Sequence, residues 1–244
     1  MNKMRLKPAL HYQLDYMVRA SLSYIGVLAV IIIFISLIRR FFGGLTVVNI
    51  LGIVRIDAGG IGGGQFTFNV GGLIIFILFV IGIVGIREDL KLFLQHGMGR
   101  ATTYFSTLII SLICAVSYGL FCELLNLAFI HWPNFPVRAM FFPAQSFFAG
   151  WFFHASLFFF AWQLGVLISL IYYRMNGVQQ TVFSVAGVAM IMFALPGGIR
   201  RIAGGEDLEA ALVALLANPA FLPLWGVLAA AGSFLLLRRA QVKD

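Results

Sequence analysis

Long, nearly uncharged apolar runs are the feature that most limits what this chain can fold into. A helix needs roughly 20 mainly apolar residues to cross the hydrocarbon core of a bilayer. Several runs approach or reach that length in a chain of 244 residues that is 61% hydrophobic and 11% charged, whereas an ordinary soluble domain is about 25% charged. We therefore expect a membrane protein. We place six spans, at about 21–38, 71–86, 103–127, 147–173, 181–195 and 220–237.

The expected fold class is an all-α membrane protein with a single transmembrane domain over residues 1–244. The sequence shows no internal repeat, and its longest polar stretch is too short to fold as a soluble domain. Besides the six spans we expect an interfacial helix at 1–20 and a cytoplasmic helix at 87–100.

The placement of basic residues predicts which side of the membrane each loop faces, because cytoplasmic loops carry an excess of Lys and Arg. With both termini inside, the inner pieces hold eleven basic residues and the outer loops six, although Arg39 and Arg40 stand on the outer side. We therefore expect a multi-pass protein of the plasma membrane with both termini in the cytoplasm. The net charge of +8 is assigned to topology and anionic lipid rather than to nucleic acid.

Residues 1–20 are polar and basic and predict an amphipathic helix on the membrane surface. Pro8 suits the first turn of a helix, and Asp15 and Arg19 stand four residues apart in the order that favours pairing. A polar stripe beside an apolar face is typical of an interfacial helix. The alternative is a helical extension of the first span.

The three outer loops differ in character. Residues 43–70 hold a glycine cluster at 59–64 between β-branched residues, which favours a short hairpin or a mobile loop. Residues 128–146 combine Pro, Trp and Phe, which is typical of an aromatic belt. Within 196–219, acids precede a short apolar run, which predicts a short helix dipping into the outer leaflet.

The sequence contains none of the catalytic or metal-binding motifs that would make this chain an enzyme. It has no phosphate loop, so we expect no ATP hydrolysis by this chain and no bound cofactor. The four histidines are scattered along the chain, so we expect no metal site. Cys114 and Cys122 would lie about 12 Å apart along a helix, beyond disulfide reach, and are interpreted as buried apolar residues.

Three polar residues inside the expected spans are candidates for a substrate path. Burying a carboxylate is costly, so Glu123 suggests a cation site or a proton carrier. The alternative for Glu123 is a position near the outer headgroups or a pairing with a neighbour such as Arg138. His154 and Gln163 in the fourth span would extend the path, or would make interhelical hydrogen bonds.

Segment 87–100 is a charged block between the second and third spans. Acids are favoured at a helix start, and glycines end helices, so Glu88 and Asp89 predict a start and Gly97 and Gly99 a stop. We expect a short amphipathic helix, with an ordinary interfacial helix as the alternative. Its apolar face would hold Leu90, Phe93 and Leu94, and another face Glu88, Lys91 and Gln95.

The pattern Arg87-Glu-Asp-Leu-Lys-Leu-Phe-Leu-Gln-His-Gly-Met-Gly-Arg100, after a glycine-containing apolar span, resembles type 2 ABC transporter permeases, especially small six-span subunits common in Gram-positive bacteria. Pro8-Ala-Leu-His-Tyr-Gln-Leu-x-x-Tyr16 is similar to their interfacial helix, and Tyr172-Tyr-Arg-Met-Asn176 to the inner end of their fourth span. The resemblance covers most of the chain. It departs at Gly99, where serine is common, and in the glycine-rich loop.

The resemblance implies a non-catalytic permease subunit of an ATP-driven exporter for a peptide, a lipid or a hydrophobic drug. Two copies of a separate ATPase subunit would bind ATP and Mg, and a second permease, identical or homologous, would complete the complex. The first, second and fifth spans would line the path between the permeases. The alternative function is a substrate-binding membrane subunit of an importer, or a secondary carrier.

In this family, the helix after the second span is a coupling helix that docks on the ATPase. Helix 8–20 would brace it, and the turn at 174–177 would add a minor contact. The residues implied in the ATPase contact are Glu88, Asp89, Leu90, Leu92, Phe93, Gln95, His96, Gly97 and Arg100.

Overall fold

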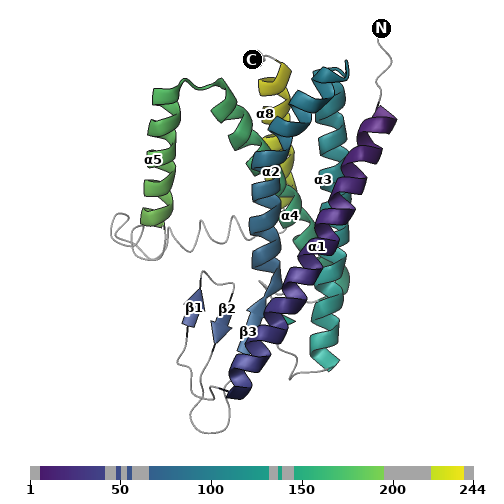
Figure 1. Ribbon diagram of the computed structural model, residues 1–244, viewed down its shortest axis with the longest axis vertical. Helices are drawn as coiled ribbons and strands as arrows, with labels where there is room; N and C mark the ends of the chain where they lie inside the picture. The colour runs from purple at the N-terminus through teal and green to yellow at the C-terminus, as the bar shows by residue number, and fades with distance from the viewer. Residues whose placement is uncertain are drawn as a thin grey trace.

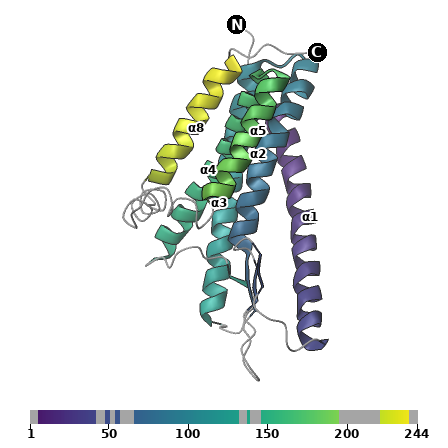
Figure 2. The ribbon, with the colours of Figure 1, turned by 90° about the vertical axis from the view of Figure 1, so that its left-hand side faces the viewer.

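Long helices dominate the structure, a computed structural model that describes residues 6–41, 48–50, 54–56, 66–131, 137–138, 146–194 and 221–238. Five of the described helices run side by side as a bundle, and the sixth, α5, stands at its flank (Figure 1; Figure 2). The helices are α1 Leu6–Phe41, α2 Val70–Gln95, α3 Arg100–His131, α4 Phe147–Arg174, α5 Gly177–Ala194 and α8 Phe221–Arg238.

Four described stretches are long and apolar enough to cross a membrane: α2, α4, α8 and the Arg100–Ala128 part of α3. They coincide with the spans expected at 71–86, 103–127, 147–173 and 220–237. The span expected at 21–38 falls within α1, and the described part of the span expected at 181–195, up to residue 194, falls within α5. The described chain therefore fits a helical transmembrane protein.

Two of the helices are longer than the sequence suggested. α1 runs without a break from Leu6 to Phe41, so no boundary separates an interfacial helix at 8–20 from the first span, and the helical extension is the form observed. α2 likewise continues past residue 86 to Gln95, which places Glu88 and Asp89 inside a helix rather than at its start. The physical reason is that Arg, Glu, Leu and Lys all favour helix, so nothing at 87–91 interrupts the backbone ladder.

A small sheet adds strands to a fold that was expected to be all-α. β1 Val48–Ile50 and β2 Val54–Ile56 form an antiparallel hairpin, β3 Phe66–Asn69 continues the sheet, and β4 Val137–Arg138 adds a parallel edge. The hairpin alternative for loop 43–70 is therefore the one observed. The glycine cluster at 59–64, most of the belt at 128–146 and the short helix expected within 196–219 lie outside the described residues.

α4 is the central helix of the bundle, since it packs against α2, α3 and α8. Its crossing with α2 is unusually close: a Cβ atom added to Gly82 would lie 2.4 Å from the Trp162 carbonyl oxygen, and one added to Gly165 would lie 2.3 Å from the Phe79 carbonyl oxygen. Small residues let helix backbones approach in this way. The crossing fixes α2, and with it the charged segment that follows.

The two ends of the bundle differ in character. The start of α1, the α2–α3 turn, the α4–α5 turn and the end of α8 lie at one end, and the sheet lies at the other (Figure 1). This is the relative arrangement that the charge count requires, with the pieces expected in the cytoplasm on a common side.

Candidate functional site

The charged segment ends in a glycine-dependent helix stop. Gly97 has a φ of 69°, in the left-handed region that favours glycine. Its N–H donates to the Leu94 carbonyl at 3.0 Å, and the Met98 N–H donates to the Phe93 carbonyl at 2.8 Å. This pair of bonds is the Schellman motif, which satisfies the last carbonyls of a helix. The stop expected at Gly97 is confirmed, and α3 begins three residues later.

The N-terminal part of α1 holds this end of α2 in place. The Gln13 amide donates to the Asp89 carboxylate at 2.5 Å and to the Thr107 hydroxyl at 3.3 Å, so α1, α2 and α3 meet at one point. One turn along, the Tyr12 ring packs edge-on against Phe93, with 6.1 Å between ring centroids. Gln13 and Tyr12, which lie within the stretch 8–20, therefore contact this segment, and they belong to α1 rather than to a separate helix.

The residues implied in the ATPase contact divide by burial. Leu90 and Phe93 are 4% and 2% exposed, so both face the interior of this subunit and are not free to touch another chain. The reason is that their apolar face packs against α1 and the core of this chain instead of a partner. Asp89, Leu92 and Arg100 are partly exposed, and the exposed members are Glu88, Gln95, His96 and Gly97. We call these four exposed residues the coupling surface.

Asp89 lies just beyond the apolar stretch 71–86 and faces inward. Burial raises the pKa of its carboxyl from 3.8 to about 6, because the charged form loses hydration. The Gln13 hydrogen bond lowers the pKa in part, and the neighbouring Glu88 charge raises it. Asp89 therefore joins three helices through a carboxyl group whose pKa is raised by burial.

Two of the three candidates for a substrate path come together deep between α3 and α4. His154 Nδ1 lies 3.3 Å from Glu123 Oε2, and the Asn126 amide donates to the same oxygen at 3.1 Å. Glu123 is 7% exposed and His154 1%, so the carboxylate is buried beside Asn126 and His154. His154 Nδ1 also lies 2.8 Å from the Gly150 carbonyl oxygen. Gly150 makes room for the pair, because a Cβ atom there would lie 2.3 Å from Glu123 Oε1.

Gln163 lies farther along α4 than His154 and is separate from the Glu123–His154 pair. Its amide donates to the Ser111 hydroxyl at 2.8 Å, and both residues are buried. It stands nine residues after His154, about 13 Å along α4, so the three candidates do not form one cluster. For Gln163 the interhelical hydrogen bond is the use that the structure shows.

α3 supplies polar partners that the sequence analysis did not single out. Thr107 accepts from Gln13, and Ser111 accepts from Gln163. The signal for both was present: Thr103, Thr107 and Ser111 recur at a helical spacing of four within an apolar span, and all three are buried. A polar stripe of this kind marks a face that looks into the bundle rather than into lipid.

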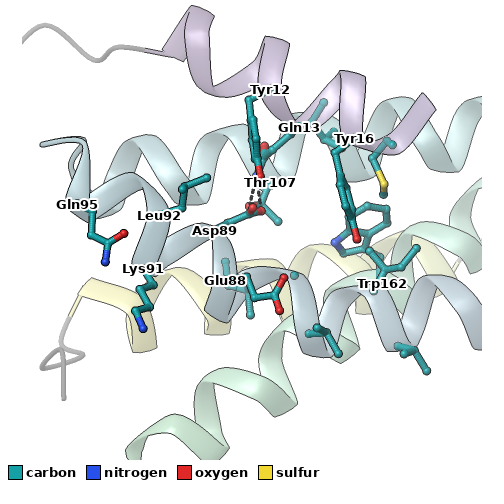
Figure 3. Close-up of a pocket in the computed structure, with 17 residues that line it drawn as sticks. Tyr12, Gln13, Tyr16, Glu88, Asp89, Lys91, Leu92, Gln95, Thr107 and Trp162 are labelled. Atoms are coloured by element: carbon teal, nitrogen blue, oxygen red, sulfur yellow. Dashed lines mark hydrogen bonds between the residues drawn. The ribbon is translucent and has the colours of Figure 1, made fainter. Parts of the chain in front are cut away.

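A pocket of about 490 Å³ opens between α1 and α2, beside Asp89 (Figure 3). We call it the α1–α2 pocket. Tyr12, Gln13 and Tyr16 line it from α1, Glu88 and Asp89 from α2, and Trp162 of α4 closes its inner end. Two buried polar atoms of the lining, Gln13 Oε1 and Trp162 Nε1, make no hydrogen bond. The pocket thus combines an apolar body with a polar, acidic rim.

Comparison with known proteins assigns the chain to no family. No family model, no curated protein and no solved structure matches it.

The described residues offer little for catalysis by a metal. None of them forms a group of three or more His, Cys, Asp or Glu side chains that could hold a metal ion. Cys114 and Cys122 are both free and buried, as the sequence analysis expected. The polar chemistry of the described part is instead concentrated at the Asp89 junction, the α1–α2 pocket and the Glu123–His154 pair.

Proposed function

We propose that this chain is the transmembrane permease subunit of an ATP-binding cassette transporter that exports a peptide, a lipid or a hydrophobic drug. The observation that carries the proposal is the charged end of α2. It presents exposed Glu88, Gln95 and His96, while Gln13 and Tyr12 tie its other side to α1. A docking element that must transmit force needs this combination of a free outer face and a fixed inner face.

Continuity of α2 supports a mechanical role for the segment. Because residues 70–95 form one helix, a displacement at Gln95 is passed along the same backbone to the Gly82–Gly165 crossing with α4. The Gln13–Asp89–Thr107 junction passes it to α1 and α3 as well. Closure of two ATPases on ATP would then shift several spans together, which is how a ligand biases a two-state element.

The remaining parts of the proposal follow from the same assignment. ATP and Mg bind to the partner ATPase, this chain has no catalytic activity of its own, and the coupling surface and both termini face the cytoplasm. The turn at 174–177 lies at the same end of the bundle as the coupling surface and would be the minor ATPase contact (Figure 1).

A second permease, identical or homologous, would contact this chain on α5. This helix touches the bundle mainly at the end of α4, where the Tyr172 and Phe183 rings lie 5.4 Å apart. Its residues Val178, Val182 and Val185 are 79%, 63% and 63% exposed. An apolar row at this helical spacing suits packing against another helix. Together with α1 and α2, it would line the path between the permeases.

The coupling surface is tested with a triple variant, Glu88→Ala with Gln95→Ala and His96→Ala, in the complex purified with its ATPase. Exposed interface residues that matter cost about 1 kcal/mol or more each, so we expect the affinity for the ATPase, and the ATPase stimulation, to fall at least tenfold. Phe93 is unsuitable for this test, because it is buried in this subunit and its loss would disturb folding.

The matched control is Asp15→Asn with Arg19→Gln. These two residues form an exposed ion pair in the N-terminal half of α1, with 2.6 Å between their charged atoms, and they are not part of the coupling surface. The control should bind and stimulate the ATPase like the unaltered protein. If the triple variant also does so while inserted in the membrane, the coupling surface is wrongly assigned.

One observation favours the other function, a secondary carrier or the substrate-binding subunit of an importer. The Glu123–His154 pair is a buried acid beside an imidazole, which is a common arrangement for carrying a proton through a membrane. Transport by this chain alone in vesicles, driven by a proton gradient without ATP or an ATPase, would establish the carrier. Transport that needs the ATPase and ATP would exclude it.

A further inference from the structure

The α1–α2 pocket has the dimensions of a small-molecule site. Its volume of about 490 Å³ falls in the range that holds drug-sized ligands. Apolar side chains of α2, including Val80, Ile81 and Val84, line it, and so does Met17 of α1. α1 packs against α3 more closely than against α2, and this leaves the space between α1 and α2.

Two buried polar atoms, on residues that line the pocket, have no hydrogen-bond partner. Trp162 is 4% exposed and its indole N–H makes no hydrogen bond, although only such a bond would offset its burial. Gln13 is 5% exposed, and its Oε1 is an unused acceptor, while its Nε2 is fully engaged with Asp89 and Thr107. Native proteins seldom leave buried polar atoms unpaired. A ligand with both a donor and an acceptor would satisfy these two.

The charged residues around the pocket favour a ligand of positive charge. Glu88 and Asp89 line it from α2, and among the described residues of its lining Lys91 is the one basic side chain. In Figure 3 the Lys91 side chain extends away from the two carboxylates, and the rings of Tyr12 and Tyr16 reach from α1 toward α2. Carboxylates beside aromatic faces attract a cation through both charge and the ring quadrupole.

We propose that the α1–α2 pocket binds a primary ammonium group carried on an apolar body. The ammonium donates to Gln13 Oε1 and to the Glu88 and Asp89 carboxylates. The apolar body lies along Val80 and Val84, and an acceptor near its inner end takes the Trp162 N–H. A soluble amphiphilic amine and the headgroup of phosphatidylethanolamine both carry this chemistry. The site requires no ATPase, so it does not rest on the proposed transport function.

The proposal is tested by binding to the full chain in nanodiscs of phosphatidylcholine. The probe is a dansyl group on a five-carbon chain that ends in a primary amine, and its neutral comparison ends in a hydroxyl. Energy transfer from tryptophan to dansyl reports occupancy, since Trp162 lines the pocket. We expect saturable binding of the amine at least tenfold tighter than of the alcohol, because hydrogen bonds to charged groups are the stronger ones.

Substitutions then place the probe in the pocket. Glu88→Gln and Asp89→Asn keep size and polarity but remove charge, and each should weaken amine binding about tenfold without changing alcohol binding. Asp15→Asn removes an exposed carboxylate that does not line the pocket and should leave both unchanged. Equal affinity for amine and alcohol would overturn the proposal, as would unchanged binding in both pocket variants.

Adding phosphatidylethanolamine to the nanodiscs separates the two sources of the ammonium. Displacement of the probe assigns the site to the lipid headgroup. Full retention of saturable probe binding assigns it to a soluble amine. In both cases the charge-dependent variants retain their effect if the ammonium chemistry is correct.

Discussion

The close crossing of α2 and α4 allows a sharp stability prediction for Gly165→Ala. The added Cβ would lie 2.3 Å from the Phe79 carbonyl oxygen and 3.1 Å from the Ile83 nitrogen. Non-bonded carbon contacts are normally about 3.5–4.0 Å, so the two helices must separate by about 1 Å at this point. Both contacting atoms belong to the backbone of α2, so no side chain can rotate away to relieve the clash.

The expected cost follows from two opposing effects. Overpacking of a well-packed interior typically costs about 1–3 kcal/mol, whereas Ala is favoured over Gly in a helix by about 1 kcal/mol. Because the clash is with backbone atoms, its cost belongs to the upper part of this range, at about 2–3 kcal/mol, and Gly165→Ala should therefore be destabilised by about 1–2 kcal/mol. Gly85→Ala is the matched control: it lies one turn from Gly82 on α2, and the nearest atom to its Cβ, in the Ile81 side chain, is 4.0 Å away. That control should be neutral or up to about 1 kcal/mol more stable.

The free energy of unfolding is measured from reversible unfolding in mixed micelles with increasing dodecyl sulfate, followed by circular dichroism. A second signature comes from Gly82→Ala combined with Gly165→Ala. Because one separation of the helices relieves both clashes, the double variant should lose less than the sum of the single losses. Equal stability of Gly165→Ala and Gly85→Ala would refute the close crossing. It would also refute the proposal that α2 passes a displacement from Gln95 to α4 through this crossing.

Three further changes test other parts of the structure. Gly97→Ala should lower the free energy of unfolding by about 1 kcal/mol, because φ is 69° there, while Gly99→Ala, with open space around it, should not. Burial raises the pKa of Asp89 from 3.8 to about 6, so the native state binds that proton more tightly than the unfolded state does. The free energy of unfolding should therefore fall as pH rises between these values, by on the order of 3 kcal/mol. Asp89→Asn should remove this pH dependence when unfolding is measured from pH 3.5 to 7. Glu123→Gln should retain ATP-driven transport in proteoliposomes, since its amide oxygen still accepts from Asn126; loss of transport by a folded variant would assign the Glu123–His154 pair to proton movement.

Local sequence patterns predicted several elements because their causes are local. Apolar runs located α2, α3, α4 and α8 to within a few residues except where polar turns extend them. The stop at Gly97 was visible because a left-handed residue after a helix is nearly always glycine. The hairpin in the 43–70 loop was one of two alternatives, and β-branched residues near turn residues supported it.

Contacts between helices in the interior could not be predicted from local sequence patterns. Asp89 was expected to face a partner protein, yet it faces Gln13, which is 76 residues away in sequence. Glu123 and His154 were separate candidates, and the close approach of α3 and α4 makes them a pair. Each of these contacts depends on the rotation of one helix about its axis relative to another, and hydropathy does not report that rotation.

The sequence by itself determined that the long helices suit a lipid bilayer, because this depends on the length of apolar runs and the placement of charges. It also determined where α2 ends, because a left-handed residue there requires glycine. The tertiary structure decided which polar groups meet and where space remains between helices. The physical reason is that small residues at 82 and 165 set how closely α2 and α4 approach. That approach fixes Trp162 and Asp89 on either side of the α1–α2 pocket.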